Sequence, residues 1–132
     1  MKRSRVQSAA PWEREVGYSR AVRTGRFIAV TGTAAIGPDG KLVGAGDAYA
    51  QTCRCIEVIR EAIEQIGGSL EDVVRTRLFV TDIDRWPEIG RAHREAFGAI
   101  LPATTMVQVA RLIDPDMLVE IEADAIIGDD DG

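Results

Sequence analysis

Carboxylate and apolar residues alternate near the end of the chain. Glu120, Glu122 and Asp124 occupy every second position of a segment whose other positions are Val119, Ile121, Ala123 and Ala125. Side chains alternate between the two faces of a strand, so the carboxylates leave one face and the apolar residues leave the other. This pattern predicts a half-buried strand over residues 117–127.

Similar β-type patterns predict five more strands. These are residues 18–22, 27–31, 41–43, 73–80 and 104–110, and Gly37-Pro38-Asp39-Gly40 has the residues of a reverse turn leading into 41–43. Along 73–80, Val74 is expected on the same face as Leu78 and Val80, and Val73 on the other.

Two segments have the spacing of amphipathic helices. In residues 48–66 the apolar stripe includes Ile56, Ile59, Ile63 and Ile66. Asp47 is a suitable N-cap, and Gly67 supplies the left-handed position that often ends a helix. A second helix is expected from about Pro87 to Phe97, with proline in its first turn.

The predicted order is therefore β-β-β-α-β-α-β-β, an α+β fold in a single domain of residues 1–132. Two helices with one-sided apolar stripes are expected to pack on one face of a mixed sheet. The other face then lacks cover, and its mixture of apolar and charged residues fits a subunit interface with polar clefts. The terminal residues 1–5 and 128–132 are expected to be flexible tails.

Composition excludes several classes of protein. The chain has no apolar run long enough to cross a bilayer and no secretory signal, so we expect a cytoplasmic protein. A net charge of −5 argues against a nucleic-acid partner. Cys53 and Cys55 would point about 200° apart on a helix, and the chain has one histidine, so we expect free thiols, no metal site and no cofactor.

Motifs along most of the chain resemble one family. They are Gly17-Tyr18-Ser19, Phe27–Thr33, Phe79–Asp82, Glu95-Ala96-Phe97, Pro102–Leu112 and Leu118–Ile126. Together they resemble the Rid family (reactive intermediate deaminases, also called YjgF-like, with the older label L-PSP endoribonuclease). The resemblance implies a chorismate-mutase-like fold, a homotrimer with small-molecule clefts between subunits, and hydrolysis of imines or enamines such as 2-aminoacrylate.

The resemblance also implies site residues. Glu120 matches the glutamate that positions or activates water, while Tyr18 and Thr31 match the cleft tyrosine and a serine near the ligand. These three form the expected catalytic set. Gly32, which follows Thr31, is expected to contact the ligand.

The expected substrate-binding residues depart from the family. Thr104 stands where the family has an arginine that pairs with the substrate carboxylate, and the loss of that cation should weaken carboxylate binding by roughly 2–3 kcal/mol. Thr105 and Met106 continue this segment, and Arg91 replaces the usual asparagine of the second helix. Arg91 and Arg111 are candidate substitutes for the cation, and Arg20 is a less favoured one. Arg111 is expected on the strand face opposite Thr104.

Other residues have plainer interpretations. Arg20, Arg91 and Arg111 are each expected to be solvent-exposed, and His93 is expected to be packed with its ring nitrogen hydrogen-bonded. Two functions remain open. The first is a hydrolase for a small imine or enamine with an atypical substrate preference. The second is a non-catalytic metabolite-binding or regulatory trimer. The acidic balance of the chain disfavours an endoribonuclease.

Overall fold

The structure, a computed structural model, describes residues 2–128. Its six strands are β1 (Arg3–Val6), β2 (Ala21–Thr24), β3 (Phe27–Thr33), β4 (Val73–Val80), β5 (Ala103–Gln108) and β6 (Val119–Ile126). Its two long helices are α1 (Ala48–Gln65) and α2 (Trp86–Phe97). Short helical turns lie at Glu13–Gly17, Leu70–Asp72 and Ile83–Arg85.

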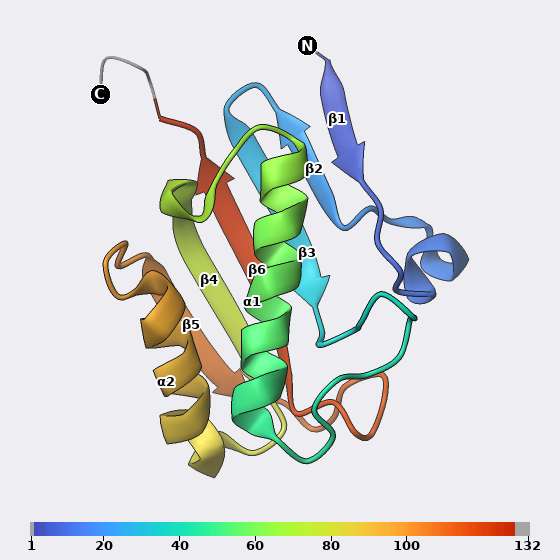
Figure 1. Cartoon of the computed structure of the whole chain (residues 1–132), viewed down its shortest axis with the longest axis vertical. Helices are drawn as coiled ribbons and strands as arrows, with labels where there is room; N and C mark the ends of the chain where they lie inside the picture. Colours follow the sequence, from blue (N-terminus) through green and yellow to red (C-terminus); the bar gives the residue numbers. More distant parts are fainter. Residues whose placement is uncertain (1, 129–132) are drawn as a thin grey trace.

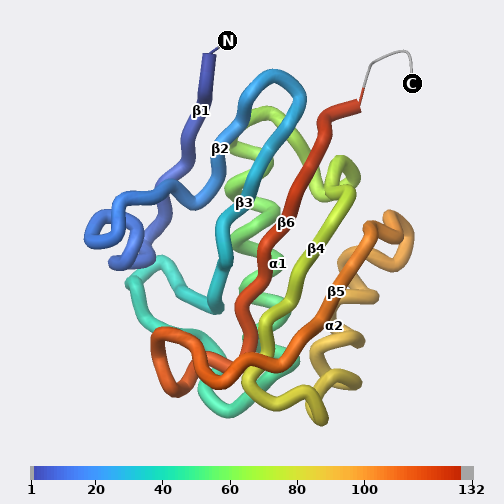
Figure 2. The backbone as a smooth tube through the Cα atoms, turned by 180° about the vertical axis from the view of Figure 1, so that it is seen from behind, coloured from blue at the N-terminus to red at the C-terminus, as the bar shows by residue number. Residues whose placement is uncertain are grey.

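The strands form one mixed sheet in the order β1-β2-β3-β6-β4-β5. β4 and β5 are parallel, and every other neighbouring pair is antiparallel. Both helices cover the same face, as Figure 1 shows, and Figure 2 shows the opposite face without helices. The predicted fold class, an α+β chain with one mixed sheet and two helices on one face, is confirmed. We call the face without helices the open face.

The core lies between α1 and the sheet. Ile59 and Ile63 of α1 are fully buried, as are Ile28 on β3 and Ile121 on β6. Each such side chain contributes about 1.5–3 kcal/mol by leaving water. Because this core holds β3 and β6 side by side under α1, it fixes the strands from which the site is built.

The ends of α1 follow local signals. The Asp47 side chain accepts a hydrogen bond from the Ala50 backbone N–H at 2.9 Å, which satisfies one of the free donors of the first turn. Gly67 has a φ of 95° just beyond the helix, where a side chain would be strained. The predicted helix therefore begins and ends within about one residue of the observed one.

Two predictions for the first strands are wrong. The predicted strand at 41–43 is reduced to one isolated bridge between Ile36 and Leu42. Residues 3–5, predicted as part of a flexible tail, instead belong to β1, which pairs antiparallel with β2. Pairing of β1 satisfies the backbone groups along the edge of β2, and Val6 becomes buried. Residues 129–132 of the predicted C-terminal tail lie outside the described part of the chain.

A register shift reverses the first residues of β4. Val73 is 3% exposed and Val74 is 44% exposed, the opposite of the predicted faces. The shift lies between Val73 and Arg75, where β4 pairs with β6. An extra residue at a bulge moves the residues before it to the other face, which strict alternation does not anticipate.

Candidate functional site

The three carboxylates of β6 lie on the open face, but their surroundings differ. The Arg77 guanidinium lies 3.2 Å from Asp124 Oδ2 and 3.6 Å from Glu122 Oε1. Within residues 2–128, Glu120 makes no hydrogen bond and no ion pair. Two of the three charges are thus paired across the sheet. Glu120 is the carboxylate left available for a ligand.

A bulge in β3 makes room for Glu120. Val30 pairs with Ala123 but Thr33 pairs with Ile121, so β3 carries one residue more than β6 over this stretch. Gly32 lies inside the bulge. A Cβ atom on residue 32 would stand 2.7 Å from Glu120 Oε2. A side chain at residue 32 would therefore displace the Glu120 carboxylate from its observed position, and bulges of this kind are common beside functional sites.

A buried ion pair supports the bulge. Arg20 Nη2 donates to Glu13 Oε2 at 2.8 Å, and the two side chains are 4% and 2% exposed. Arg20 Nη1 also donates to the Gly32 carbonyl oxygen at 2.8 Å. The prediction that Arg20 is solvent-exposed is wrong. The side chain instead joins the N-terminal segment to the bulge.

The pKa of Glu13 reflects these contacts. Burial alone would raise the pKa of this carboxyl, but hydrogen bonds from Ser8 and Arg20 outweigh burial and hold the pKa below its ordinary value. Glu13 is therefore charged at neutral pH and neutralises Arg20.

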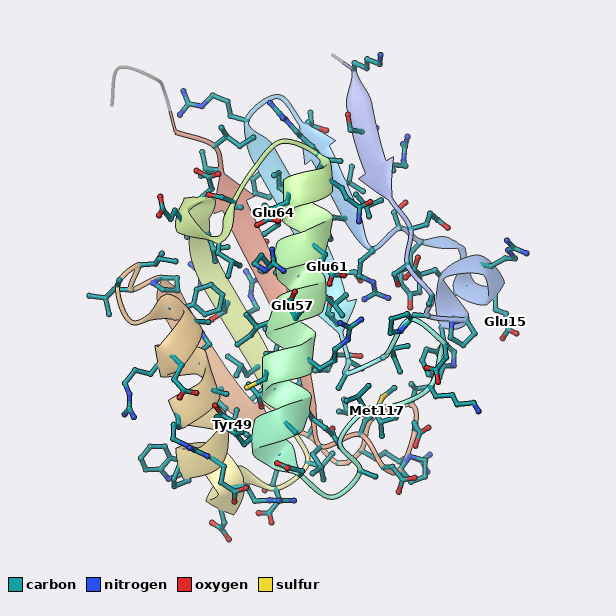
Figure 3. The ribbon with its side chains drawn as sticks, in the orientation of Figure 1. Glu15, Tyr49, Glu57, Glu61, Glu64 and Met117 are labelled. Atoms are coloured by element: carbon teal, nitrogen blue, oxygen red, sulfur yellow. The ribbon has the colours of Figure 1, made fainter. Side chains whose placement is uncertain are left out.

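A cavity of about 510 Å³ opens beside Glu120. It lies between the N-terminal segment, the loop after β3, the loop before β6 and one side of α1. Three predicted site residues line it: Tyr18, Gly32 and Glu120. Figure 3 shows Met117, another lining residue, among these loops. The structure thus brings much of the predicted water-handling group together around one hollow.

Burial raises the pKa of Glu120 above its ordinary value. The positive charge of Arg20 opposes this rise and the negative charge of Glu122 adds to it. A carboxylate with a raised pKa is a stronger base when it is ionised. At neutral pH such a group is suited to take a proton from a water molecule held in the cavity.

Thr31 does not line this cavity. It borders a second hollow of about 500 Å³ on the open face, together with Tyr18, Glu122 and Asp124. Tyr18 borders both hollows. Thr31 and Gly32 are adjacent in the sequence, but they border different hollows.

The other predicted substrate-binding residues, apart from Gly32, lie elsewhere. Thr104, Thr105 and Met106 are on β5, and strands β4 and β6 separate β5 from β3. Arg91 is exposed on α2, with its guanidinium carbon 3.9 Å from the centre of the Tyr49 ring. Neither hollow includes any of these four residues. One copy of the chain therefore does not unite them with Glu120.

Thr104 faces α2 and takes part in a chain of hydrogen bonds. Its hydroxyl lies 2.8 Å from the Thr76 hydroxyl, which lies 2.9 Å from Nε2 of His93. The His93 ring also packs against Phe97 at 4.7 Å between centroids. The predicted packing of His93 agrees with these contacts, and burial lowers its pKa.

Sequence reasoning did not place the arginines of the cavity wall. Arg54 and Arg111 both line the cavity. The predicted face of Arg111 assumed a strand that runs to residue 110. In the structure β5 ends at Gln108, so strand alternation does not apply to Arg111. Beyond β5 the chain brings Arg111 to the wall of the cavity that Glu120 also lines.

The remaining expectations concern metals, thiols and membranes. Within residues 2–128, no three acidic, histidine or cysteine side chains gather in a group that would hold a metal ion. Cys53 is exposed and Cys55 is buried, and both are free thiols. None of the described helices is long and apolar enough to cross a bilayer.

Comparison with known proteins identifies the family. The sequence profile of the family described as endoribonuclease L-PSP matches residues 8–127. An uncharacterised protein of Streptomyces coelicolor is 40% identical over 124 residues, which cover 94% of this chain and 92% of that protein. The 3-aminoacrylate deaminase RutC of Acinetobacter baylyi is 35% identical over 104 residues, 79% of this chain and 82% of that protein.

A solved structure agrees with the sequence relatives. The crystal structure of a YjgF/YER057c/UK114 family member from Mycobacterium tuberculosis has a TM-score of 0.88 and 48% identity, and the match covers 96% of this chain and all of that one. The predicted family is confirmed: the chain belongs to the endoribonuclease L-PSP family, also known as the YjgF or Rid family.

Proposed function

We propose that this protein is a hydrolase of the deaminase type that acts on a small imine or enamine, with Glu120 as the general base. The observation that carries the proposal is the Glu120 carboxylate: half-buried, without an ionic partner among residues 2–128, and bordering a cavity large enough for a metabolite. The relative named 3-aminoacrylate deaminase supports this reaction class.

The proposed reaction needs only water and one proton carrier. Glu120 takes a proton from water as the water oxygen bonds to the imine carbon, and the nitrogen accepts a proton, which gives a carbinolamine. The C–N bond then breaks as the hydroxyl proton of the carbinolamine passes to nitrogen, so ammonia leaves and a carbonyl compound remains. An enamine first gains a proton on carbon and loses one from nitrogen to become the imine. We assign to Tyr18, which lines the cavity, the role of orienting the water or the leaving nitrogen.

Assembly as a homotrimer is part of the proposal. The open face has no cover among the described residues, and Thr104 lies across the sheet from Glu120. Both sets of predicted residues can border one cleft only if a second copy brings its β5 edge to the first copy's Glu120. Light scattering after size-exclusion chromatography tests this point, because a monomer would contradict it.

The proposed substrate preference differs from that expected of the family. The Thr104 hydroxyl has no charge and is already bonded to Thr76. A substrate carboxylate would therefore gain little at this position. We expect archetypal 2-aminoacrylate deaminase activity to be weak if Thr104 is the only anchor for the carboxylate.

The test uses imines made in situ by amino-acid oxidases. Wild-type protein should accelerate ammonia release from at least one imine, and Glu120→Gln should lose at least a hundredfold in rate. Glu122→Gln, on the same face of the same strand, is the matched control and should retain activity. Equal rates for wild type and Glu120→Gln across the panel would contradict the proposal.

The neutral side chain of Thr104 favours a second candidate function, which is binding of a metabolite without catalysis. The same cleft would then bind a metabolite without turning it over, as a regulatory trimer. A ligand that binds only the folded state raises the melting temperature. A metabolite that raises it without any ammonia release would support this alternative, and release that depends on Glu120 would exclude it.

A further inference from the structure

Five charged residues among residues 2–128 line the cavity, and three of them are neutralised by contacts with other described residues. Arg20 is paired with the buried Glu13. Arg54 donates to the Ile36 carbonyl oxygen and lies 3.8 Å from Glu61, which is also a lining residue. These contacts leave little net charge for a ligand to use.

The other two lining charges are unpaired. Within residues 2–128, Arg111 makes no hydrogen bond or ion pair through its side chain, and the same is true of Glu120. Arg111 is exposed, so its guanidinium can reach a ligand at the mouth of the cavity. The cavity therefore offers one free cation and one free carboxylate among its described lining residues.

The rest of the wall is mainly apolar. Met117 is buried and packs with Ala34 and Ile36, and Trp12 and Leu112 pack against this cluster. Val16 and Ile113 border the cavity from two different segments and are 70% and 61% exposed. Large apolar side chains left in water beside a hollow are typical of a surface that receives an apolar group.

We propose that this cavity binds small carboxylates that carry a bulky apolar group. Arg111 receives the carboxylate, and the apolar group packs against Trp12, Leu112 and Met117. The inference rests on the proposed function in one respect: where the ligand is a substrate, its reacting carbon lies beside Glu120. The substrate class is then an imine or enamine with a carboxylate and a large apolar side chain.

Two physical arguments favour this class. A guanidinium binds a carboxylate through two parallel hydrogen bonds, so Arg111 supplies, from within one chain, the cation that Thr104 does not. A cavity of about 510 Å³ lies within the range for ligands well above three carbon atoms. A small polar ligand would leave the apolar wall in contact with water.

The test measures binding of three probes by calorimetry to the intact protein. They are 4-phenylbutyrate, its neutral analogue 4-phenylbutan-1-ol, and propionate, which lacks the ring. Wild-type protein should bind 4-phenylbutyrate at least tenfold more tightly than either of the others. Arg111→Gln should lower the affinity for 4-phenylbutyrate at least tenfold and leave that for the alcohol unchanged. Arg94→Gln removes an exposed cation from α2, away from the cavity, and should bind as wild type does.

A second variant tests the apolar wall. Ile113→Ser should weaken both ring-containing probes about equally, and its exposed position means that folding should not be affected. Unchanged binding of 4-phenylbutyrate by Arg111→Gln, or no binding of that probe by wild type, would overturn the inference.

Turnover separates this inference from the proposed function. Glu120-dependent ammonia release with no effect of Arg111→Gln on binding would leave the function standing and remove the site. Binding that depends on Arg111 without any turnover would keep the site and remove the hydrolase.

Discussion

The Glu120 carboxylate occupies the space that a side chain on Gly32 would need, since Oε2 lies 2.7 Å from the position of a Cβ atom there. The φ angle of Gly32 is not in the left-handed region, so this glycine serves proximity and not backbone conformation. The β3 bulge and the proposed base are therefore coupled by direct contact.

Gly32→Ala should impair catalysis more than folding. The obstructing atoms belong to the end of a flexible side chain, so the carboxylate can move aside at little cost in stability. A displacement of about 1 Å can lower a rate up to a hundredfold, and we expect kcat/KM to fall tenfold to a hundredfold.

Gly90→Ala is the control for that variant. A Cβ at residue 90 meets only the Trp86 ring at 3.7 Å, and alanine stabilises a helix by about 1 kcal/mol relative to glycine. Thermal melting and steady-state kinetics on both variants check the prediction. A large loss of stability with Gly32→Ala would show that the glycine serves folding instead.

Glu120→Gln should stabilise the protein at neutral pH. Because burial raises the pKa of Glu120 in the folded state, the folded protein holds a proton more tightly than the unfolded chain. The stability that the Glu120 carboxyl contributes is present below its pKa in the unfolded chain, about 4.3. It is lost as pH rises through its pKa in the folded protein. The neutral amide avoids this loss, so its melting temperature should exceed that of wild type at pH 7.

The gain from Glu120→Gln should disappear near pH 4, where wild-type Glu120 is also protonated. Glu122→Gln should show no such gain, since it removes a group that is paired with Arg77. Melting curves from pH 4 to pH 8 check both statements. A lower melting temperature for Glu120→Gln at pH 7 would contradict the assigned surroundings of Glu120.

Glu13→Gln should destabilise the fold by about 3 kcal/mol, since it leaves Arg20 buried without a counter-charge. Glu57→Gln is the matched control, because its pair with Arg60 is partly exposed and should cost less than about 1 kcal/mol. Urea unfolding at pH 7 measures both. The double variant Glu13→Gln/Arg20→Met should recover part of the loss, which a purely steric effect of the introduced amide would not allow.

The same buried pair predicts sensitivity to acid. The pKa of Glu13 is lowered in the folded state, so its contribution is present above the unfolded pKa of about 4.3 and is lost as pH falls through the folded pKa. Stability of the wild type should fall steeply below pH 4, and Glu13→Gln should show a flatter decline. Parallel slopes for the two proteins would contradict this assignment.

His93 should add a third pH dependence of stability. Burial lowers its pKa, so its contribution is complete above the unfolded pKa of about 6.5 and declines as pH falls toward the folded pKa. His93→Gln can keep a hydrogen bond to Thr76 but cannot titrate. The free energy of unfolding between pH 6.5 and 5 should therefore vary less in His93→Gln than in wild type, as measured by urea unfolding at each pH.

Local signals in the sequence were sufficient for most elements of the fold. Asp47 and Gly67 mark the ends of α1 because capping depends on residues within a few positions of the helix end. The alternation along β6 correctly places Glu120, Glu122 and Asp124 on one face, since the strand period needs no tertiary information.

Strand pairing was decided by contacts distant in sequence. The turn at 37–40 has the residues of a hairpin, yet β1 and not residues 41–43 completes the sheet beside β2. Both segments are short and their local preferences are weak. Residues 3–6 gain a full set of backbone hydrogen bonds by pairing with the free edge of β2, whereas residues 41–43 form one isolated bridge. This edge exists only in the assembled sheet, so the sequence around each segment does not reveal it.

The site required the tertiary structure most of all. The sequence by itself determined that three carboxylates share a face of β6, but not which of them is free. Arg77 reaches Glu122 and Asp124 from β4, more than 40 positions earlier in the chain, and leaves Glu120 without a partner among the described residues. Arg111 enters the same cavity only because the chain turns after β5. Charge pairing depends on distances of a few ångströms, and these distances exist only once the strands are packed.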